Sequence, residues 1–261
     1  MHTSSKTALV TGASGGIGYE LGKLFAADGF NLVLVARSED KLNALATELQ
    51  NTHGVEVTVL AKDLSDPAAP TEIYEALQSQ AITVDALINN AGYGIHGAQI
   101  ETATSDELNM LQLNIIALTH LTRLFLPAMV ERGAGHIMNV GSTASFQPCP
   151  LMATYGASKA YVLNFTDALA EEMRGTGVRV TALCPGVTRT GFQARANVGA
   201  MRLLRGPSMT AQQVAAIGYR GLLRGRRVVI PGFFNQLIAF SSRVTPRTWV
   251  TRIARWMMEK D

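Results

Sequence analysis

The sequence is poor in cysteine and histidine, which limits the chemistry it can carry. Cys149 and Cys184 are the only cysteines among 261 residues, too few for a disulfide framework in a chain of this length, and we expect both to be reduced thiols. Two cysteines and five scattered histidines never reach zinc-ligand spacing, so no metal site is predicted. Charged residues make up 16% and hydrophobic residues 47%. Disordered chains show the opposite balance, so the composition predicts a folded protein with a large core.

Targeting signals are also missing from the pattern. The N-terminal segment has no basic region followed by a long apolar run and a small-residue cleavage site, so no signal peptide is predicted. No uninterrupted apolar run approaches the ~20 residues that span a bilayer. We therefore expect a cytoplasmic protein.

Positive charge is concentrated towards the C-terminal end. From Arg220 onward nine basic residues stand against two acidic ones, a net charge of +7 in a chain whose total is +3. Within residues 232–261, Trp249, Ile253 and Trp256 stand at i, i+4 and i+7. Such a basic amphipathic extension suits packing over a substrate mouth, contact with another subunit, or peripheral contact with a membrane, and these alternatives stay open here. No recognisable nucleic-acid-binding module accompanies the charge, so nucleic acid is not expected as a partner.

Short runs rich in Val, Ile and Leu alternate with longer helical segments. Strands that are apolar on both faces are typical of a parallel sheet. We expect strands at residues 7–11, 31–36, 56–61, 86–89, 136–140, 179–183 and 227–230, and helices at 17–28, 41–52, 107–130 and 155–174 among about six. The pattern predicts an α/β fold, a single Rossmann-type doubly wound domain over residues 1–261 with a seven-stranded parallel sheet flanked by helices.

One stretch interrupts this alternation. Residues 188–209 show no clear period and include three glycines. They follow the sixth strand, at the end where sheets of this kind bind ligands. We predict a substrate lid there, with an ordinary surface loop as the alternative.

A glycine-rich turn joins the first strand to the first helix. Gly12, Gly16 and Gly18 are spaced as G-x-x-x-G-x-G. Glycines in such a turn permit positive φ and let the backbone approach a pyrophosphate at the helix N-terminus. The spacing differs from the usual G-x-G-x-x-G, and an ordinary strand-to-helix turn is the alternative.

Further motifs follow in order along the chain. The tetrapeptide Asn89-Asn90-Ala91-Gly92 ends the fourth strand, Ser142 follows the fifth, Tyr155 and Lys159 form a Y-x-x-x-K pair, and Pro185-Gly186 follows the sixth. Together with the TGxxxGxG turn, these motifs resemble the short-chain dehydrogenase/reductase family, from about residue 6 to residue 190. Tyr155 and Lys159 share a helix face, and a neighbouring ammonium lowers the pKa of a phenol towards the neutral range.

The resemblance implies a role for each of these residues. Tyr155 would be the general acid/base, Lys159 would bind the nicotinamide ribose and lower the pKa of Tyr155, and Ser142 would polarise the carbonyl. Asn114 would hold a water in a proton relay to the lysine, with a structural hydrogen bond as the alternative. Asp63 would accept from the adenine amino group, with a helix cap as the alternative. The cofactor-binding residues implied are Gly12, Ser14, Gly16, Ile17, Gly18, Asp63, Leu64, Asn90, Ala91, Gly92, Tyr155, Lys159, Pro185, Gly186 and Thr188.

The end of the second strand bears on the choice of cofactor. The position where an acid would bind a ribose 2′-hydroxyl holds Ala36, and Arg37 follows. Arginine makes charge-assisted bonds to phosphate, so we expect NADP(H) in preference to NAD(H). Many NADP-preferring members of the family carry a second basic residue inside the glycine turn, where this chain has Ser14 and Gly15.

The resemblance implies an NADP(H)-dependent oxidoreductase that interconverts a carbonyl, ketone or aldehyde, and an alcohol by hydride transfer. Apolar residues such as Phe146, Leu151 and Met152 beside the expected pocket, and Phe192, Met201, Leu203 and Leu204 in the predicted lid, favour an apolar small-molecule substrate. Members of this family are commonly dimeric or tetrameric, so a homodimer or homotetramer is expected. A catalytically silent NADP(H)-binding sensor is the alternative, and the intact set of catalytic residues argues against it.

Overall fold

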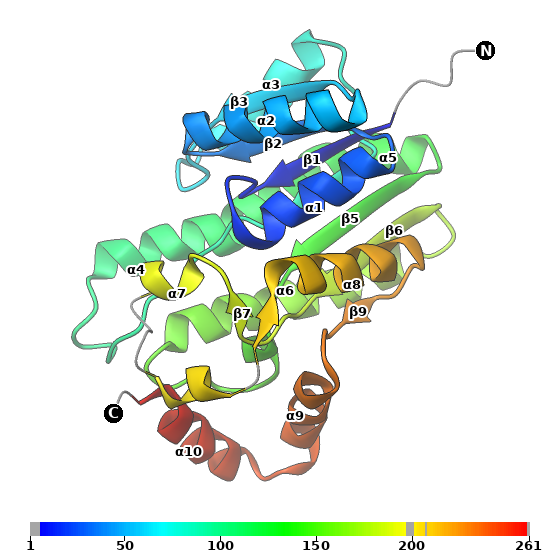
Figure 1. Cartoon of the computed structure of the whole chain (residues 1–261). Coiled ribbons are helices and arrows are strands. Elements are labelled where there is room, and N and C mark those ends of the chain that lie inside the picture. The colour runs from blue at the N-terminus through cyan, green and yellow to red at the C-terminus, as the bar shows by residue number, and fades with distance from the viewer. Residues whose placement is uncertain (1–5, 197–200, 207, 260–261) are drawn as a thin grey trace.

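Seven parallel strands form one sheet at the centre of the protein. In a computed structural model, which describes residues 6–196, 201–206 and 208–259, the strand order is β3-β2-β1-β4-β5-β6-β9 (Figure 1). The strands are β1 (Thr7–Thr11), β2 (Asn31–Ala36), β3 (Val57–Ala61), β4 (Ala86–Asn89), β5 (Gly135–Val140), β6 (Val178–Leu183) and β9 (Val228–Val229). At the centre, Val10 lies opposite Leu34 on one side and Ile88 on the other. The predicted doubly wound, seven-stranded parallel sheet is confirmed.

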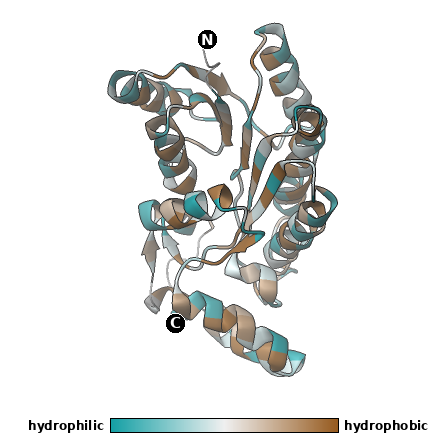
Figure 2. Cartoon of the chain, turned by 90° about the vertical axis from the view of Figure 1, so that its right-hand side faces the viewer, coloured by the Kyte–Doolittle hydropathy of each residue, from teal (hydrophilic) through white to brown (hydrophobic). Residues whose placement is uncertain are grey.

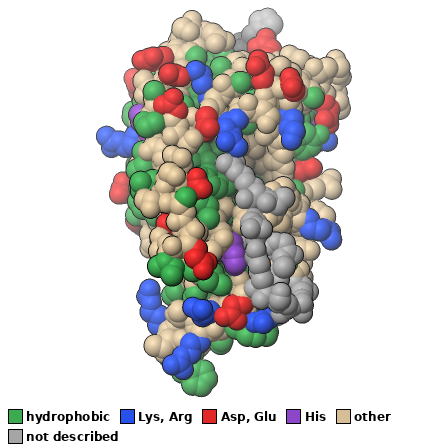
Figure 3. Space-filling model, turned by 90° about the vertical axis from the view of Figure 1, so that its left-hand side faces the viewer, with side chains coloured by type: hydrophobic (Ala, Val, Ile, Leu, Met, Phe, Trp, Pro, Cys, Tyr) green, Lys and Arg blue, Asp and Glu red, His purple; other side chains and the backbone are tan. Residues whose placement is uncertain are grey.

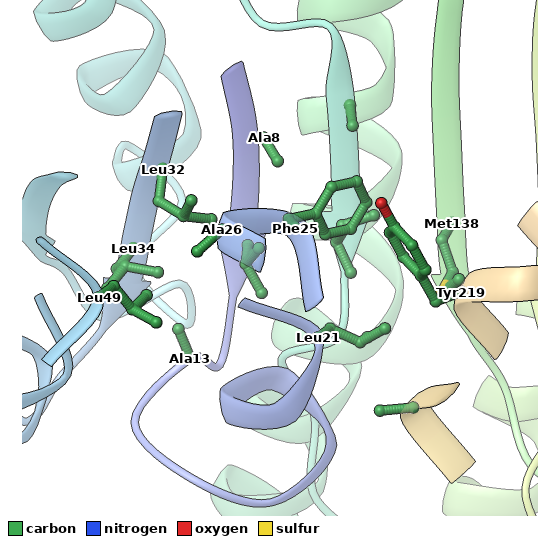
Figure 4. Packing of buried hydrophobic residues seen from close by; sticks show 14 of the residues in the cluster. Ala8, Ala13, Leu21, Phe25, Ala26, Leu32, Leu34, Leu49, Met138 and Tyr219 are labelled. Atoms are coloured by element: carbon green, nitrogen blue, oxygen red, sulfur yellow. The ribbon is translucent and has the colours of Figure 1, made fainter. Parts of the chain in front are cut away.

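Helices cover both faces of the sheet. One face packs against α1 (Gly16–Ala27), α2 (Glu39–His53) and α8 (Ala211–Leu223), and the other against α3 (Ala69–Ser79), α5 (Leu118–Glu131) and α6 (Ala153–Glu172). Alternation along β1 divides the core, since Ala8 and Val10 belong to the first cluster and Leu9 to the second. In the first cluster the rings of Phe25 and Tyr219 meet edge to face with centroids 4.8 Å apart (Figure 4).

The predicted helix over residues 107–130 is not regular throughout. It consists of α4 (Thr104–Leu111), a π-helical turn η1 (Gln112–Ala117) and α5. A π turn widens the helix locally and is frequent at functional sites. Here it contains the buried Asn114, whose contacts with two other segments are described below.

The run Thr104–Glu131 is the one segment of the described residues that is long and apolar enough to cross a bilayer by length and composition. In the fold it lies against the sheet. Its side chains Leu113, Leu121 and Phe125 belong to the second core cluster. Core helices pass the same test of length and composition as membrane-spanning ones, and its packing makes this run a core helix.

The stretch predicted as irregular contains short regular elements. It holds β7 (Thr188–Arg189), α7 (Phe192–Arg195) and η3 (Arg202–Arg205), while β8 (Met209–Thr210), partly beyond it, pairs in parallel with β7. The Gln193 side chain donates to the carbonyl of Thr188 and accepts from the amide of Thr190, which orders this turn. Residues 197–200 and 207 of the predicted lid lie outside the described residues.

Two further helices follow β9 and lie below the sheet in Figure 1. These are α9 (Phe233–Val244) and α10 (Arg247–Met258). We call the pair the C-terminal hairpin. It projects from the lower end of the molecule, with hydrophobic and hydrophilic residues interspersed along it (Figure 2).

Candidate active site

The candidate site is a cavity of about 770 Å³ at the carboxyl ends of the strands. It lies where the strand order reverses between β1 and β4, the usual ligand position in open α/β sheets. All the predicted site residues except Gly18 and Asn114 line it. The structure therefore brings together residues from the glycine turn, from the ends of five further strands (β2 to β6) and from α6.

Glycine is required in the first turn by both conformation and space. Gly12 and Gly16 have φ of +66° and +58°. A Cβ at Gly12 would lie 2.7 Å from Asn90 Nδ2 and 3.0 Å from the Ala91 Cα, so no side chain fits between the turn and the end of β4. Gly18, also predicted to bind cofactor, does not line the cavity; it packs against the turn, where a Cβ would lie 2.5 Å from the Gly12 carbonyl oxygen. The turn thus fits a dinucleotide phosphate group, with Gly18 supporting it from behind.

A hydrogen-bond network ties the end of β4 to the glycine turn. Asn90 Nδ2 donates to the Thr11 carbonyl at 2.9 Å and to the Gly12 carbonyl at 3.3 Å. Thr11 Oγ1 accepts from the amides of Asn90 and Ala91 at 2.9 and 3.0 Å. Asn89 points away from the cavity and donates to Asn139. Thr11 belongs to the TGxxxGxG motif, but the motif alone assigned it no role of its own, and these hydrogen bonds supply one.

Helix α6 carries the two residues of the Y-x-x-x-K motif on one buried face. Lys159 Nζ lies 5.9 Å from the centroid of the Tyr155 ring and donates to the Val140 carbonyl at 2.8 Å. Ser142 follows β5 and begins the turn η2 (Thr143–Phe146), where its Oγ accepts from the Ala144 amide at 3.1 Å. The hydroxyl proton of Ser142 is therefore left to donate to another group.

The pKa values of the pair differ from the sequence-based expectation. Burial raises the pKa of Tyr155 to about 12, although a hydrogen bond with Ser142 acts in the opposite direction. Burial also lowers the pKa of Lys159 to about 8. The expected lowering of the Tyr155 pKa by Lys159 is not found: burial of the phenol dominates, and Ser142 is the group that acts in the lowering direction.

Asn114 lies behind the cavity, in the π turn. Its Oδ1 accepts from the Tyr93 amide at 3.2 Å, and its Nδ2 donates to the Tyr93 carbonyl at 2.9 Å and to Ser158 Oγ at 3.1 Å. A Cβ at Gly92 would approach both Asn114 Oδ1 and Lys159 Nζ, at 3.0 and 3.3 Å. The side-chain amide therefore fastens the loop after β4 to α6 beside the lysine, and the water relay stays a prediction.

Arg37 and Asp63 face each other at the opposite end of the cavity. Arg37 Nη1 lies 3.6 Å from Asp63 Oδ2, and both side chains are about half exposed. Asp63 Oδ1 accepts from the amide and hydroxyl of Ser65. Burial alone would raise the pKa of Asp63, but the Ser65 hydrogen bonds and the Arg37 charge outweigh it and lower the pKa. Asp63 shapes this turn and does not cap α3, which begins six residues later.

Two further lysines line this end of the cavity and were missed. Lys62 pairs with Glu72, whereas exposed Lys41, on α2, has no carboxylate partner among the described residues. Lys41 stands four residues after Arg37, in the first turn of α2. A basic residue at that spacing could have been read from the sequence.

The end of the cavity near Tyr155 is apolar. Phe192 lies with its ring centroid 5.5 Å from that of Tyr155. Of the residues predicted for the substrate pocket, Phe146 and Leu151 do not line the cavity. The apolar lining residues here are Met152, Phe192, Met201, Leu203 and Leu204, joined by Phe234, Ile238, Met257 and Met258 of the C-terminal hairpin.

The C-terminal hairpin is fastened over this end by contacts from distant segments. His96 Nε2 lies 2.8 Å from the Met258 carbonyl oxygen. Arg202 Nη1 donates to the Trp256 carbonyl at 3.1 Å and pairs with Glu259 at 3.2 Å. The hairpin therefore forms one wall of the site, which answers one of the alternatives left open for the C-terminal extension.

Replacing Lys159 by methionine is expected to stabilise the protein. A lysine pKa lowered from its ordinary 10.5 to about 8 corresponds to about 3 kcal/mol against the charged form at neutral pH. Losing the hydrogen bond to Val140 offsets ~1 kcal/mol of that gain. The unfolded chain binds the Lys159 proton more tightly than the folded chain does. The free energy of unfolding of the wild type therefore rises with pH between about pH 8 and the unfolded pKa of 10.5. Above that range the stability gained by Lys159→Met disappears.

Urea unfolding of both proteins at neutral pH and near pH 10 measures this difference. Lys23→Met is the control, because the Lys23 side chain is only partly buried and pairs with Glu48 near the surface. If the free energy of unfolding changed equally with pH in wild type and Lys159→Met, burial of the charged lysine would not destabilise the protein.

Comparison with known proteins places the chain among nucleotide-dependent oxidoreductases. A family model described as short chain dehydrogenase matches residues 6–200. The chain is 33% identical over 201 residues to a ketoacyl reductase, HetN, of Nostoc sp., covering 77% of this chain and 70% of that protein. It is 38% identical over 184 residues to the NADP-dependent 3-hydroxy acid dehydrogenase YdfG of Salmonella typhi, covering 69% and 71%. A solved short-chain dehydrogenase from Sphingobium yanoikuyae in complex with NADPH superposes with a TM-score of 0.83 at 34% identity, covering 92% and 93%.

Proposed function

This chain belongs to the short-chain dehydrogenase family and is an oxidoreductase of CH–OH groups, and from that premise we propose that it interconverts a ketone or aldehyde and an alcohol with NADP(H). The observation that carries the proposal is the position of Tyr155. Its hydroxyl is buried beside Ser142, on the same helix face as Lys159, in the cavity that also contains the glycine turn.

Proton transfer is the task of the protein's own groups. When bound, the cofactor supplies or accepts the hydride. Tyr155 donates its proton to the carbonyl oxygen in reduction and removes it from the alcohol in oxidation. Because burial raises the pKa of Tyr155 to about 12, the phenol stays protonated at neutral pH and is ready to act as an acid. The hydroxyl proton of Ser142 is directed at the same carbonyl oxygen, and the charge of Lys159 favours the phenolate as it forms.

Charge at the far end of the cavity supports NADP(H) as the preferred cofactor. Arg37 follows β2, and Lys41 adds a second positive charge from α2. Lys41 would supply the second positive charge that many NADP-preferring members of the family carry in the glycine turn, where this chain has Ser14 and Gly15. Asp63 Oδ2 is the carboxylate oxygen that does not bond Ser65, so it can accept from an adenine amino group.

We further propose that residues 188–209 act as a substrate lid on the single domain. Phe192, Met201 and Leu203 of this segment line the cavity beside Tyr155. Their apolar side chains favour an apolar carbonyl substrate.

A homo-oligomer is proposed through the outer face of α5 and α6. Ile116 of η1 is half exposed next to α5, at a groove that it lines with Thr119, His120, Arg123, Leu124 and Tyr161. Ile116→Glu would replace an apolar side chain by a charge that association would bury, so the mass in light scattering should fall towards that of one subunit. Ile100→Glu, at a fully exposed position outside the groove, is the control. A mass unchanged by Ile116→Glu would exclude this face as the contact.

Consumption of reduced cofactor against a panel of ketones and aldehydes tests the proposed function. NADPH and NADH are compared side by side, with Tyr155→Phe as the inactive reference. Turnover with NADPH that vanishes in this variant supports the assignment. Tight NADPH binding without turnover on any carbonyl would favour a cofactor sensor instead.

A further inference from the structure

The C-terminal hairpin carries most of the exposed large hydrophobic side chains of the described residues. Eight of the fourteen lie within its two helices, and both tryptophans of the chain are among them. Exposed large apolar side chains gathered in one segment of the chain mark an interaction site. The eight are Phe233, Phe234, Leu237, Phe240, Val244, Trp249, Ile253 and Trp256.

Helix α9 separates an inner from an outer face. Ala239 is its one buried residue and Ile238 lines the cavity on the same side. Four exposed apolar side chains stand at i, i+4, i+7 and i+11, which places them in one stripe. This outer stripe, opposite Ala239, consists of Phe233, Leu237, Phe240 and Val244.

Helix α10 repeats this arrangement and adds charge. Its inner face buries Val250, Ala254 and Met258. Trp249, Ile253 and Trp256 form an exposed stripe, and by the 3.6-residue repeat Arg252 and Arg255 flank it on the side away from the buried residues. The outer side of α10 is therefore both aromatic and basic.

The hairpin has positive charge without internal compensation. Residues 233–258 contain four arginines and neither Asp nor Glu. Arg243, Arg247 and Arg252 are exposed and pair with no carboxylate among the described residues, while Arg255 pairs with Glu259. Figure 3 shows hydrophobic and basic side chains next to one another at this lower end of the molecule.

We propose that the C-terminal hairpin is a docking surface for an anionic lipid bilayer. Tryptophan and phenylalanine settle at the boundary between headgroups and acyl chains, and arginines beside them reach lipid phosphates while their stems stay in apolar surroundings. The uncompensated arginines provide charge complementarity to anionic headgroups. The outer stripes of α9 and α10 supply the apolar part.

A second copy of this chain fits the same surface less well. In a two-fold contact the hairpin would face itself, and its four arginines would meet four more without a carboxylate from either hairpin. An anionic bilayer would instead place negative charge opposite these arginines.

Docking would also bring the substrate cavity to the lipid surface. The same helices line the cavity with Phe234, Ile238 and Met257. An apolar carbonyl compound dissolved in the bilayer would then reach Tyr155 without crossing water. This consequence rests on the proposed function, whereas lipid binding itself requires no turnover.

Vesicle binding of the full chain tests the proposal. The probes are vesicles of phosphatidylcholine alone and vesicles with equal parts of phosphatidylcholine and phosphatidylserine. Because both tryptophans lie in α10, their emission reports on this surface, and we expect a blue shift with the anionic vesicles only. Rising salt should weaken the binding as it screens the arginines.

Two variants preserve the tryptophan reporters and remove one component each. Leu237→Ser with Phe240→Ser removes apolar area, and Arg243→Glu with Arg252→Glu reverses charge. Each should weaken binding to anionic vesicles about tenfold. Ile100→Ser and Arg226→Glu, exposed outside the hairpin, are matched controls that should bind as wild type. Bound NADPH and unchanged thermal unfolding verify the fold.

Three results would overturn the proposal. The first is no emission shift in the wild type, and the second is equal binding by wild type and hairpin variants. The third is a lowered mass of the hairpin variants in sedimentation without any effect of vesicles, which would assign the surface to a second copy. A wild type that binds vesicles but reduces no carbonyl would separate this inference from the proposed function.

Discussion

Tyr155→Phe is expected to lower kcat for carbonyl reduction about a thousandfold while leaving NADPH binding nearly unchanged. The substitution removes one hydroxyl, and a positioned general acid contributes roughly 10²–10⁴ to a rate. The phenyl ring keeps its buried position and its contact with Phe192. Steady-state rates with the best carbonyl of the panel, and a fluorescence titration with NADPH, measure the two quantities separately.

Tyr74→Phe is the matched control for this prediction. Tyr74 lies on α3, where its ring packs against Phe125 far from the cavity. It should leave kcat unchanged, so a loss confined to Tyr155→Phe identifies the reacting hydroxyl. Substantial turnover in Tyr155→Phe would move the acid role to Ser142 or to a water molecule.

The strands and the active-site motifs were accessible from the sequence because local signals encode them. Each central strand is a short apolar run, and even the two-residue edge strand β9 was located by Val228 and Val229. The capping box of Thr210 and Gln213 could have revealed α8 in the same way. Helices and strands that are encoded by local sequence patterns can be predicted without knowing which segments pack against them.

Contacts between distant segments could not be read in this way. The π turn brings Asn114 to Tyr93 and to Ser158, 21 and 44 residues away in the chain. The wall formed by the C-terminal hairpin depends on His96 meeting Met258, 162 residues later. The sequence shows an amphipathic helix there, but only the fold decides which face meets the cavity.

The same limit applies to the pKa of Tyr155. The motif places an ammonium one helical turn from the phenol, which alone lowers the phenol's pKa. How deeply α6 buries both groups depends on the loop after β4 and on the lid. The sequence therefore placed the two side chains on one helix face, while the direction of the Tyr155 pKa shift had to come from the structure.

Arg37→Ala is expected to raise KM for NADPH by about 10–100-fold and to change KM for NADH little. Hydrogen bonds to charged groups are worth about 1.5–3 kcal/mol, which converts to roughly that factor. The ion pair with Asp63, at 3.6 Å between half-exposed side chains, is too weak to withhold the guanidinium from a 2′-phosphate. Kinetics with both cofactors at low and high salt measure the effect.

Lys41→Ala should act in the same direction with a smaller effect, because an ammonium on α2 provides charge without the paired donors of a guanidinium. Lys23→Ala, which removes a partly exposed positive charge from α1 outside the cavity, should leave both KM values as they are. If Arg37→Ala raised KM equally for NADPH and NADH, Arg37 would be supporting the adenine end through Asp63, and the 2′-phosphate would be recognised elsewhere. A selective loss with NADPH that weakens at high salt would instead assign phosphate recognition to the residue that follows β2, where an acid would have selected NADH.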